Sequence, residues 1–126
     1  MHRQFILFAL FISPFSIQEE ALDRHVVRSH SNGAPYVVAY TRPFDQERVK
    51  EELYYDNGNL DYVGHYKRGQ EHGEWVYYWE NGNVKSYEYY INGREEGEHY
   101  ECNELGEKVK VSHYRKGVLI REELMR

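Results

Sequence analysis

The seven histidines are the residues of this chain best suited to hold a metal ion, but their spacing argues against a shared one. His65 and His113 occupy the same column of a 24-residue repeat, and Tyr89 stands between them in that column. Because neighbouring strands lie about 4.8 Å apart, two repeats of two strands separate these histidines by roughly 20 Å, too far for one zinc ion to bridge. His72 and His99 lie at other phases of the repeat. We expect packing and surface roles for the histidines, with no metal and no cofactor.

Adjacent carboxylates could indicate a glycoside hydrolase. They occur at Glu51-Glu52, Glu95-Glu96 and Glu122-Glu123. A glycosidase needs two carboxyl groups about 5–9 Å apart across a cleft, whereas neighbouring residues of a strand point to opposite faces of the sheet. The sequence also contains no nucleophile elbow, P-loop or dinucleotide-binding fingerprint. These observations predict that the protein is not an enzyme.

Cys102 is the single cysteine, so the sequence allows no internal disulfide. In the repeat it aligns with Tyr54 and Tyr78, which indicates a packed position in a strand. The alternative, for an exported protein, is a disulfide between two molecules.

The elements that position all these side chains repeat every 24 residues. Three columns of the repeat are invariant: Gly58, Gly82 and Gly106; Tyr66, Tyr90 and Tyr114; and Gly69, Gly93 and Gly117. A fixed period of this length indicates stacked supersecondary units, none of which can bury its own apolar face alone.

Each unit carries two turn signals. The first is Asn-Gly at residues 57–58 and 81–82, with an earlier copy at Asn32-Gly33 and a Leu105-Gly106 variant. Asn-Gly between alternating runs is a strong hairpin signal, because glycine adopts positive φ without strain. The second signal is a pair of glycines four residues apart, in 67–73 and 92–97. We expect a longer loop of several residues there.

Alternating runs rich in aromatic and β-branched residues separate the turns and predict strands rather than helices. The expected strands are 51–55, 60–66, 74–79, 84–90, 98–102, 108–114 and 118–124, after a divergent hairpin within 25–40. We therefore predict an all-β fold: an elongated single antiparallel sheet of about eight strands, built from stacked β-hairpins. The domain spans 25–126, with units of about 25–49, 50–73, 74–97 and 98–124.

A single-layer sheet cannot bury both of its faces, so one face is expected to keep aromatic side chains exposed. Tyr is unusually frequent, with 13 copies beside 2 Trp, and both residue types are common at binding hot spots. The candidate partner-binding residues lie around the central hairpin: Trp75, Tyr77, Trp79, Tyr87 and Tyr89. The alternative is that these rings only cover the sheet.

Residues 1–18 differ from the rest of the chain. His2 and Arg3 precede an apolar run from Phe5 to Ile12, and Pro14 closes it. This pattern is typical of a secretory signal peptide, and the run is too short to cross a bilayer as a helix. We expect an exported protein that is periplasmic, on the cell surface or extracellular. The alternative is an uncleaved anchor.

The charge pattern bounds the partners. The formal net charge is −5, and Lys and Arg are interspersed with Asp and Glu. No basic stripe is present, so nucleic acid is not an expected partner. Lys67, Arg68 and Arg94 fall near the loop glycines, which leaves a modest basic rim as weak support for a membrane surface.

The repeat resembles a known family. Tyr55-Asp56-Asn57-Gly58, Tyr66, Gly69 and Gly73-Glu74 form a pattern that returns 24 residues later from Trp79 to Glu98 and in part a third time. This pattern is similar to the variant MORN repeat of bacterial YwqK-type antitoxin-like proteins.

The resemblance implies stacked hairpins without catalytic residues, acting as an interaction or scaffold module. We expect an unidentified protein partner, with self-association included. The alternatives are binding of phospholipid or carbohydrate, and antitoxin-like inhibition of a partner.

Overall fold

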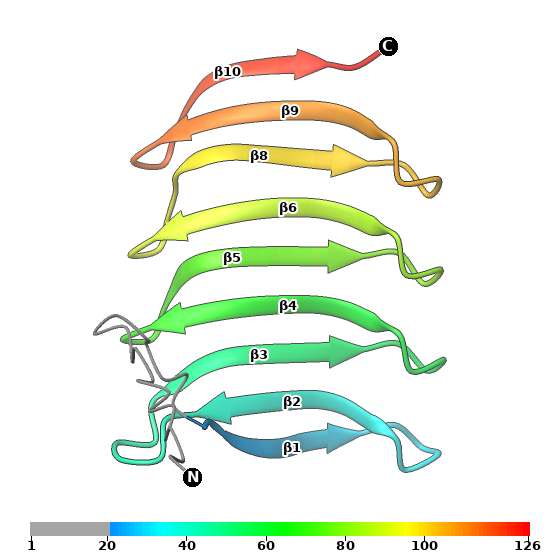
Figure 1. Cartoon of the computed structure of the whole chain (residues 1–126), viewed down its shortest axis with the longest axis vertical. Helices are drawn as coiled ribbons and strands as arrows, with labels where there is room; N and C mark the ends of the chain where they lie inside the picture. Colours follow the sequence, from blue (N-terminus) through cyan, green and yellow to red (C-terminus); the bar gives the residue numbers. More distant parts are fainter. Residues whose placement is uncertain (1–20) are drawn as a thin grey trace, which may run out of the picture.

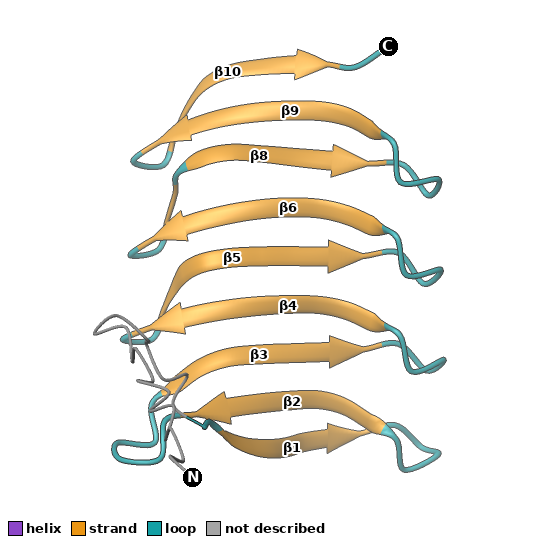
Figure 2. Ribbon diagram, viewed as in Figure 1, coloured by secondary structure: helices purple, strands orange, loops and turns teal. Residues whose placement is uncertain are grey.

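The computed structural model describes residues 21–126, and every regular element in that range is a strand. The strands are β1 (Asp23–Ser29), β2 (Pro35–Thr41), β3 (Arg48–Tyr54), β4 (Leu60–Lys67), β5 (Gln70–Tyr78), β6 (Val84–Ile91), β7 (Arg94–Glu95), β8 (Gly97–Cys102), β9 (Lys108–Arg115) and β10 (Val118–Leu124). They form one antiparallel sheet in chain order, with the short β7 pairing with β6 (Figures 1 and 2). The prediction of a single sheet of stacked hairpins is confirmed. The expected signal peptide, 1–18, lies outside the described residues.

The Asn-Gly turns have three residues rather than two. In the turn after β3, the Gly58 N–H donates to the Tyr55 carbonyl at 3.0 Å, and the Tyr55 N–H donates to the Asn59 carbonyl at 2.9 Å. Gly58 has a φ of 86°, so a type I turn is followed by a left-handed glycine. Asn57 keeps negative φ and accepts the Asn59 N–H on its Oδ1 at 2.9 Å. The expected positive φ is confirmed at the glycine of all four such turns: Gly33, Gly58, Gly82 and Gly106.

The expected long loops at 67–73 and 92–97 are wrong. Lys67 pairs directly with Gln70, and the two residues between them, Arg68 and Gly69, have φ values of 52° and 76°. Positive φ at both positions defines a tight type I′ hairpin turn. The same pattern holds at Asn92-Gly93 and Lys116-Gly117. The second glycine of each predicted loop lies at the strands instead: Gly73, with φ 97°, is inside β5, where the register with β4 shifts.

Hydrogen bonds that cross one repeat tie the three-residue turns together. The Tyr55 hydroxyl donates to the Tyr78 carbonyl at 2.7 Å, and Trp79 Nε1 donates to the Cys102 carbonyl at 3.2 Å. The turn asparagines continue this ladder, because Asn57 and Asn59 both donate to the Glu80 carbonyl, and Asn81 and Asn83 both donate to the Glu104 carbonyl. The column of turns is therefore a bonded edge of the sheet.

The two faces of the sheet carry different residues. One, here called the tyrosine face, has a row of directly paired residues that runs across strands β2 to β9: Val38, Glu52, Val63, Val76, Tyr87, Tyr100 and Val111. The opposite side, here called the tryptophan face, centres on Trp75. Only a few hydrophobic residues in the described range are buried, among them Val38 at 0% and Trp75 at 8% exposure. The core is thus two thin layers of side chains, one on each face.

Trp75 is packed down onto the sheet because Gly64 lies opposite it in β4. The indole Nε1 donates to the His65 carbonyl at 3.0 Å. Tyr62 stacks on the indole at 5.6 Å between ring centroids, and Tyr66 and Tyr90 meet it edge-on at 5.1 and 6.1 Å. Aromatic pairs in these arrangements add about 0.5–1.5 kcal/mol each beyond their buried area.

Candidate functional site

The structure distributes the five predicted binding aromatics over three places. Trp75 and Tyr77 lie on the tryptophan face, since they pair with Gly64 and Tyr62 of β4. Tyr87 and Tyr89 lie on the tyrosine face, and Trp79 lies at a turn. The predicted exposure of Trp75 is wrong, because only 8% of it is accessible. The other four are partly exposed.

The tyrosine face carries the best-ordered exposed aromatic pair. Tyr87 and Tyr100 stack with ring centroids 5.2 Å apart and planes 11° from parallel. The ammonium of Lys108 lies 4.0 Å from the Tyr100 centroid. Burial raises the pKa of both hydroxyls, with the Glu74 carboxylate adding to the effect at Tyr87. Both rings are therefore neutral at physiological pH.

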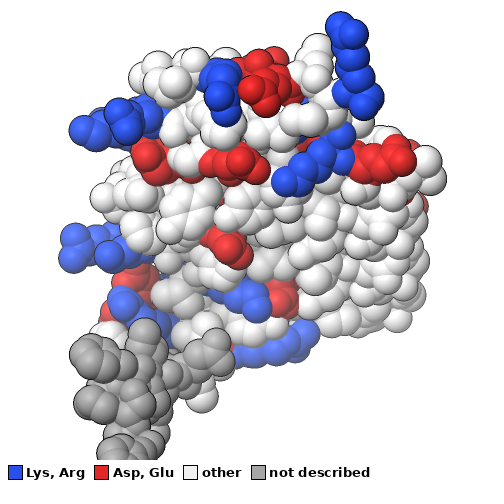
Figure 3. Space-filling view, turned by 45° about the horizontal axis from the view of Figure 1, so that its top comes forward, with Lys and Arg blue, Asp and Glu red and all other residues white. Residues whose placement is uncertain are grey.

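Tyr89 extends this surface toward the type I′ turns. It pairs with Glu74 across β5 and β6, two residues from Tyr87 on the same face. The Tyr87 hydroxyl reaches the Glu74 carboxylate at 3.5 Å. We call the surface formed by Tyr87, Tyr89 and Tyr100 the tyrosine patch. In the space-filling view, basic and acidic side chains are interspersed on the visible surface, with broad uncharged areas between them (Figure 3).

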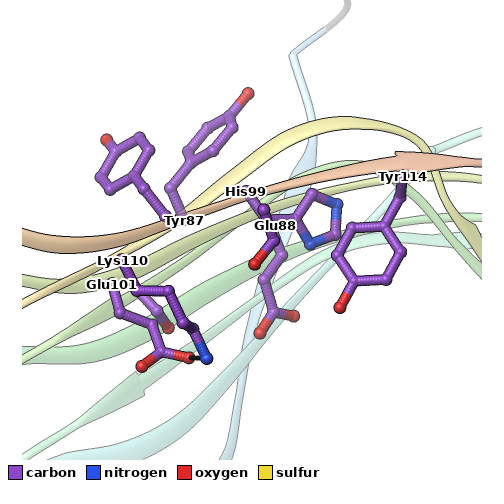
Figure 4. Close-up of a pocket in the computed structure, with 9 residues that line it drawn as sticks. Tyr87, Glu88, His99, Glu101, Lys110 and Tyr114 are labelled. Atoms are coloured by element: carbon purple, nitrogen blue, oxygen red, sulfur yellow. Dashed lines mark ion pairs between the residues drawn. The ribbon is translucent and has the colours of Figure 1, made fainter. Parts of the chain in front are cut away.

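The tryptophan face has a second feature that the sequence reasoning missed, a polar hollow of about 70 Å³ over β6, β8 and β9. Its polar lining is Ser86, Glu88, His99, Glu101, Lys110, Ser112 and Tyr114. Figure 4 shows Glu88, His99 and Tyr114 gathered on one side of the sheet, with Tyr87 projecting from the other. The ring of His99 lies 4.6 Å from that of Tyr114.

The hollow exists because the repeat loses its rings there. At positions 24 residues after Tyr62, Trp75 and Tyr77 stand Ser86, His99 and Glu101. Each replacement is smaller or polar, so the space that the indole and phenols fill in one unit stays open in the next. Comparing these columns in the sequence would have located the hollow.

His99 and Ser112 pair directly across β8 and β9 and are 7% and 4% exposed. They do not form a nucleophile and its base. His99 Nε2 contacts the Tyr89 carbonyl at 3.0 Å, and the Ser112 hydroxyl donates to Glu122 at 3.3 Å. A Ser/His mechanism requires the hydroxyl to bond to the imidazole, so this arrangement serves packing.

The charged groups of the hollow are also paired. Lys110 Nζ lies 2.6 Å from a Glu101 carboxylate oxygen, which raises the pKa of the lysine. The Tyr90 hydroxyl donates to Glu88 at 2.8 Å. Every ionisable side chain here thus has a partner within the sheet, and the hollow offers shape and polarity rather than a reactive group.

Three further observations concern the described part of the chain. Its His, Cys, Asp and Glu side chains form no group of three or more that could hold a metal ion. Residues 21–126 include no helix with the length and apolarity needed to cross a membrane. Cys102 is buried at 6% exposure, which fits the packed position and not the disulfide between molecules.

No protein-family model matches the chain, and no curated protein matches it significantly in sequence. Among solved structures, the chain is similar to part of the Glycosylation Associate Protein (Gap123) complex from Streptococcus agalactiae, with 19% identity and a TM-score of 0.47. The match covers 82% of this chain and 18% of that chain, so this chain spans about a fifth of its length. A similarity of this size carries no argument about function.

Proposed function

We propose that this protein is a non-enzymatic interaction or scaffold module, exported after removal of residues 1–18, and that its tyrosine patch binds a protein partner. The observation that carries the proposal is the stacked pair Tyr87–Tyr100, half-buried in a sheet that no second layer covers within residues 21–126. Exposed aromatic patches on otherwise polar surfaces typically mark interaction sites. The resemblance to variant MORN repeats, which act as interaction modules, supports the same function.

The chemistry of the patch favours a protein over a lipid surface. Its rings are neutral and rigid, and Tyr side chains supply contact area at a low entropic cost. Glu74 and Lys108 place one charge of each sign beside the rings. Anionic membranes select several Lys and Arg on one side, a pattern that the mixed charges around the patch do not match.

Binding is tested with the mature chain, residues 19–126, immobilised and exposed to the exported fraction of the source cells. Tyr87→Ala and Tyr89→Ala are compared with Phe44→Ala, which removes a 71% exposed ring from the loop between β2 and β3. We expect the first two variants to lose the captured protein and the third to retain it, at a temperature where all three are folded. If loss of capture follows loss of melting temperature, the patch is structural. Capture of liposomes or glycans instead would identify the alternative ligand classes.

Export is tested separately with a tagged full-length chain. We expect the tagged protein outside the cytoplasm, shortened by about 16–20 residues. Uncleaved protein confined to the cytosol would contradict export and favour antitoxin-like inhibition of a cytosolic partner.

A further inference from the structure

The last strand, β10, has a neighbour on one side only, β9, within the described residues. Every residue of β10 is exposed. Its apolar side chains are accessible to an unusual degree, with Val118 at 61%, Leu119 at 47%, Ile120 at 64% and Leu124 at 76%. An exposed apolar edge strand is a template for pairing with another strand.

The backbone of β10 presents hydrogen-bonding groups at this edge. The Met125 N–H donates to the Val109 carbonyl of β9 at 2.8 Å, and Leu124 and Glu123 continue the same register against Lys110 and Val111. Because inward and outward bonding alternate along an antiparallel strand, Glu122 and Leu124 direct their N–H and C=O groups to the open side.

Strand direction limits how a second copy can use this edge. The sheet has nine positions in order, all paired antiparallel, so β1 and β10 run in the same direction (Figure 1). Stacking β10 on β1 of another copy would therefore create a parallel pair. A two-fold axis perpendicular to the sheet pairs β10 with β10 in antiparallel orientation, which continues the pattern of every other strand pair here.

Charge selects the register of such a pair. Arg121 and Glu123 lie on the same face and contact each other at 3.4 Å. With the two-fold axis beside Glu122, Arg121 of each copy faces Glu123 of the second copy, and Ile120 faces Leu124. Centring the axis on Arg121 would oppose two guanidinium groups, and centring it on Glu123 would oppose two carboxylates. Opposite charges directly across a strand pair stabilise it, and like charges destabilise it.

The favoured register has one unfavourable contact, because Glu122 faces itself across the axis. The cost is reduced by groups on the same face: the Ser112 hydroxyl donates to Glu122 at 3.3 Å, and Lys110 lies across from Leu124, next to Glu122. Two cross-strand ion pairs and two apolar pairs thus stand against one carboxylate pair.

The other edge is less suited to self-pairing. β1 carries Arg24 and Arg28 but a single carboxylate, Asp23. Self-pairing of β1 cannot match each arginine with an acidic residue, as β10 can.

We propose that β10 pairs with β10 of a second copy across a two-fold axis beside Glu122, which joins two chains into one continuous antiparallel sheet. This interface is an edge and lies apart from the tyrosine patch, so it stands or falls independently of the proposed partner binding. The dimer would present two tyrosine patches on the same side of one sheet, since a two-fold axis perpendicular to the sheet keeps its faces aligned.

The first test is a charge swap, read by sedimentation velocity of the mature chain across a concentration series. Arg121→Glu opposes two carboxylates at both ion pairs and should weaken dimerisation about tenfold or more. Arg121→Glu combined with Glu123→Arg restores opposite charges across the axis and should recover dimerisation. Glu122→Gln should strengthen it. Circular dichroism and melting of each variant confirm that the fold is retained. A wild-type monomer at all concentrations, or a double variant as weak as the single one in a folded state, overturns the proposal.

The second test locates the axis by oxidation. Glu122→Cys places two thiols opposite each other, within the Cα separation of about 4.4–6.8 Å that a disulfide spans. Leu124→Cys is the matched control, because in this register it faces Ile120 and not itself. We expect a covalent dimer from the first variant and little from the second. Equal cross-linking of both, or preferential cross-linking of the control, contradicts the register.

Discussion

Gly64→Ala is the substitution whose effect follows most directly from the structure. A Cβ at this position would lie 2.9 Å from Cδ2, Cε2 and Cε3 of Trp75, closer than carbon atoms pack. The indole cannot retreat easily, because its Nε1 is bonded to the His65 carbonyl and tyrosine rings surround it. Inserting a methyl group into such a packed site costs about 1–3 kcal/mol. For a domain of this size, that lowers the melting temperature by about 5–15 °C.

The reasoning is checked by a double-mutant cycle with Trp75→His, measured by urea unfolding. The histidine copies the next unit, where His99 pairs with Ser112, a residue that carries a Cβ. With the indole gone, Gly64→Ala should stabilise the protein by about 0.5–1 kcal/mol, because glycine is unfavourable within a strand. The sign of the effect therefore reverses between the two backgrounds. An equal effect in both, or a neutral Gly64→Ala in the wild type, would refute close packing of Trp75 on Gly64.

Three other predictions test separate parts of the structure. Gly82→Val should lower the free energy of unfolding by about 1–2 kcal/mol, since its φ of 91° is strained for a β-branched residue although no atom lies within 4 Å; an unchanged urea midpoint would contradict the turn. Burial and then the carboxylates of Glu51 and Glu88 raise the pKa of Tyr62 and Tyr90 above the usual 10.0, so their contribution to stability is complete below pH 10 and is lost as the pH rises further. Absorbance at about 295 nm should then show tyrosinate forming together with unfolding, and a Tyr62→Phe/Tyr90→Phe variant should lose less stability in alkali. Cys102 should react slowly with a thiol reagent in the folded protein and rapidly in urea, because it is 6% exposed; rapid labelling of the native chain would show that β8 opens readily.

The sequence predicts the sheet well because its columns report a periodic backbone. The recurring glycines fix where the chain reverses, and the alternating runs between them fix strand type and order. The turn types were beyond this reasoning, because a dipeptide does not decide how many residues separate the last paired positions. Arg68 and Lys116 adopt positive φ beside glycine, and neither residue type suggests a type I′ turn on its own.

Side-chain placement was predicted less well, for a reason visible in one residue. Gly64 has no glycine 24 positions later, where Glu88 and then Ser112 stand. Such an isolated glycine within a strand indicates a close approach by a large side chain, and Trp75 is the residue opposite. Treating it as part of an exposed set overlooked this signal. The polar hollow follows from the same columns, whereas the pairing of its charges depends on rotamers that no sequence pattern reports.

The hydrogen-bonded column of turns has a consequence for how the chain folds. Each bond in it joins residues 21 to 24 positions apart, as from Asn59 to Glu80 or from His30 to Tyr54, and each strand pairs with the next one in sequence. The contact order is low for an all-β protein, so loop closure is fast at every step. Folding can therefore begin at the central hairpin of β5 and β6 and spread in both directions. The terminal hairpins would then exchange their amide hydrogens first, while the centre stays protected until global unfolding.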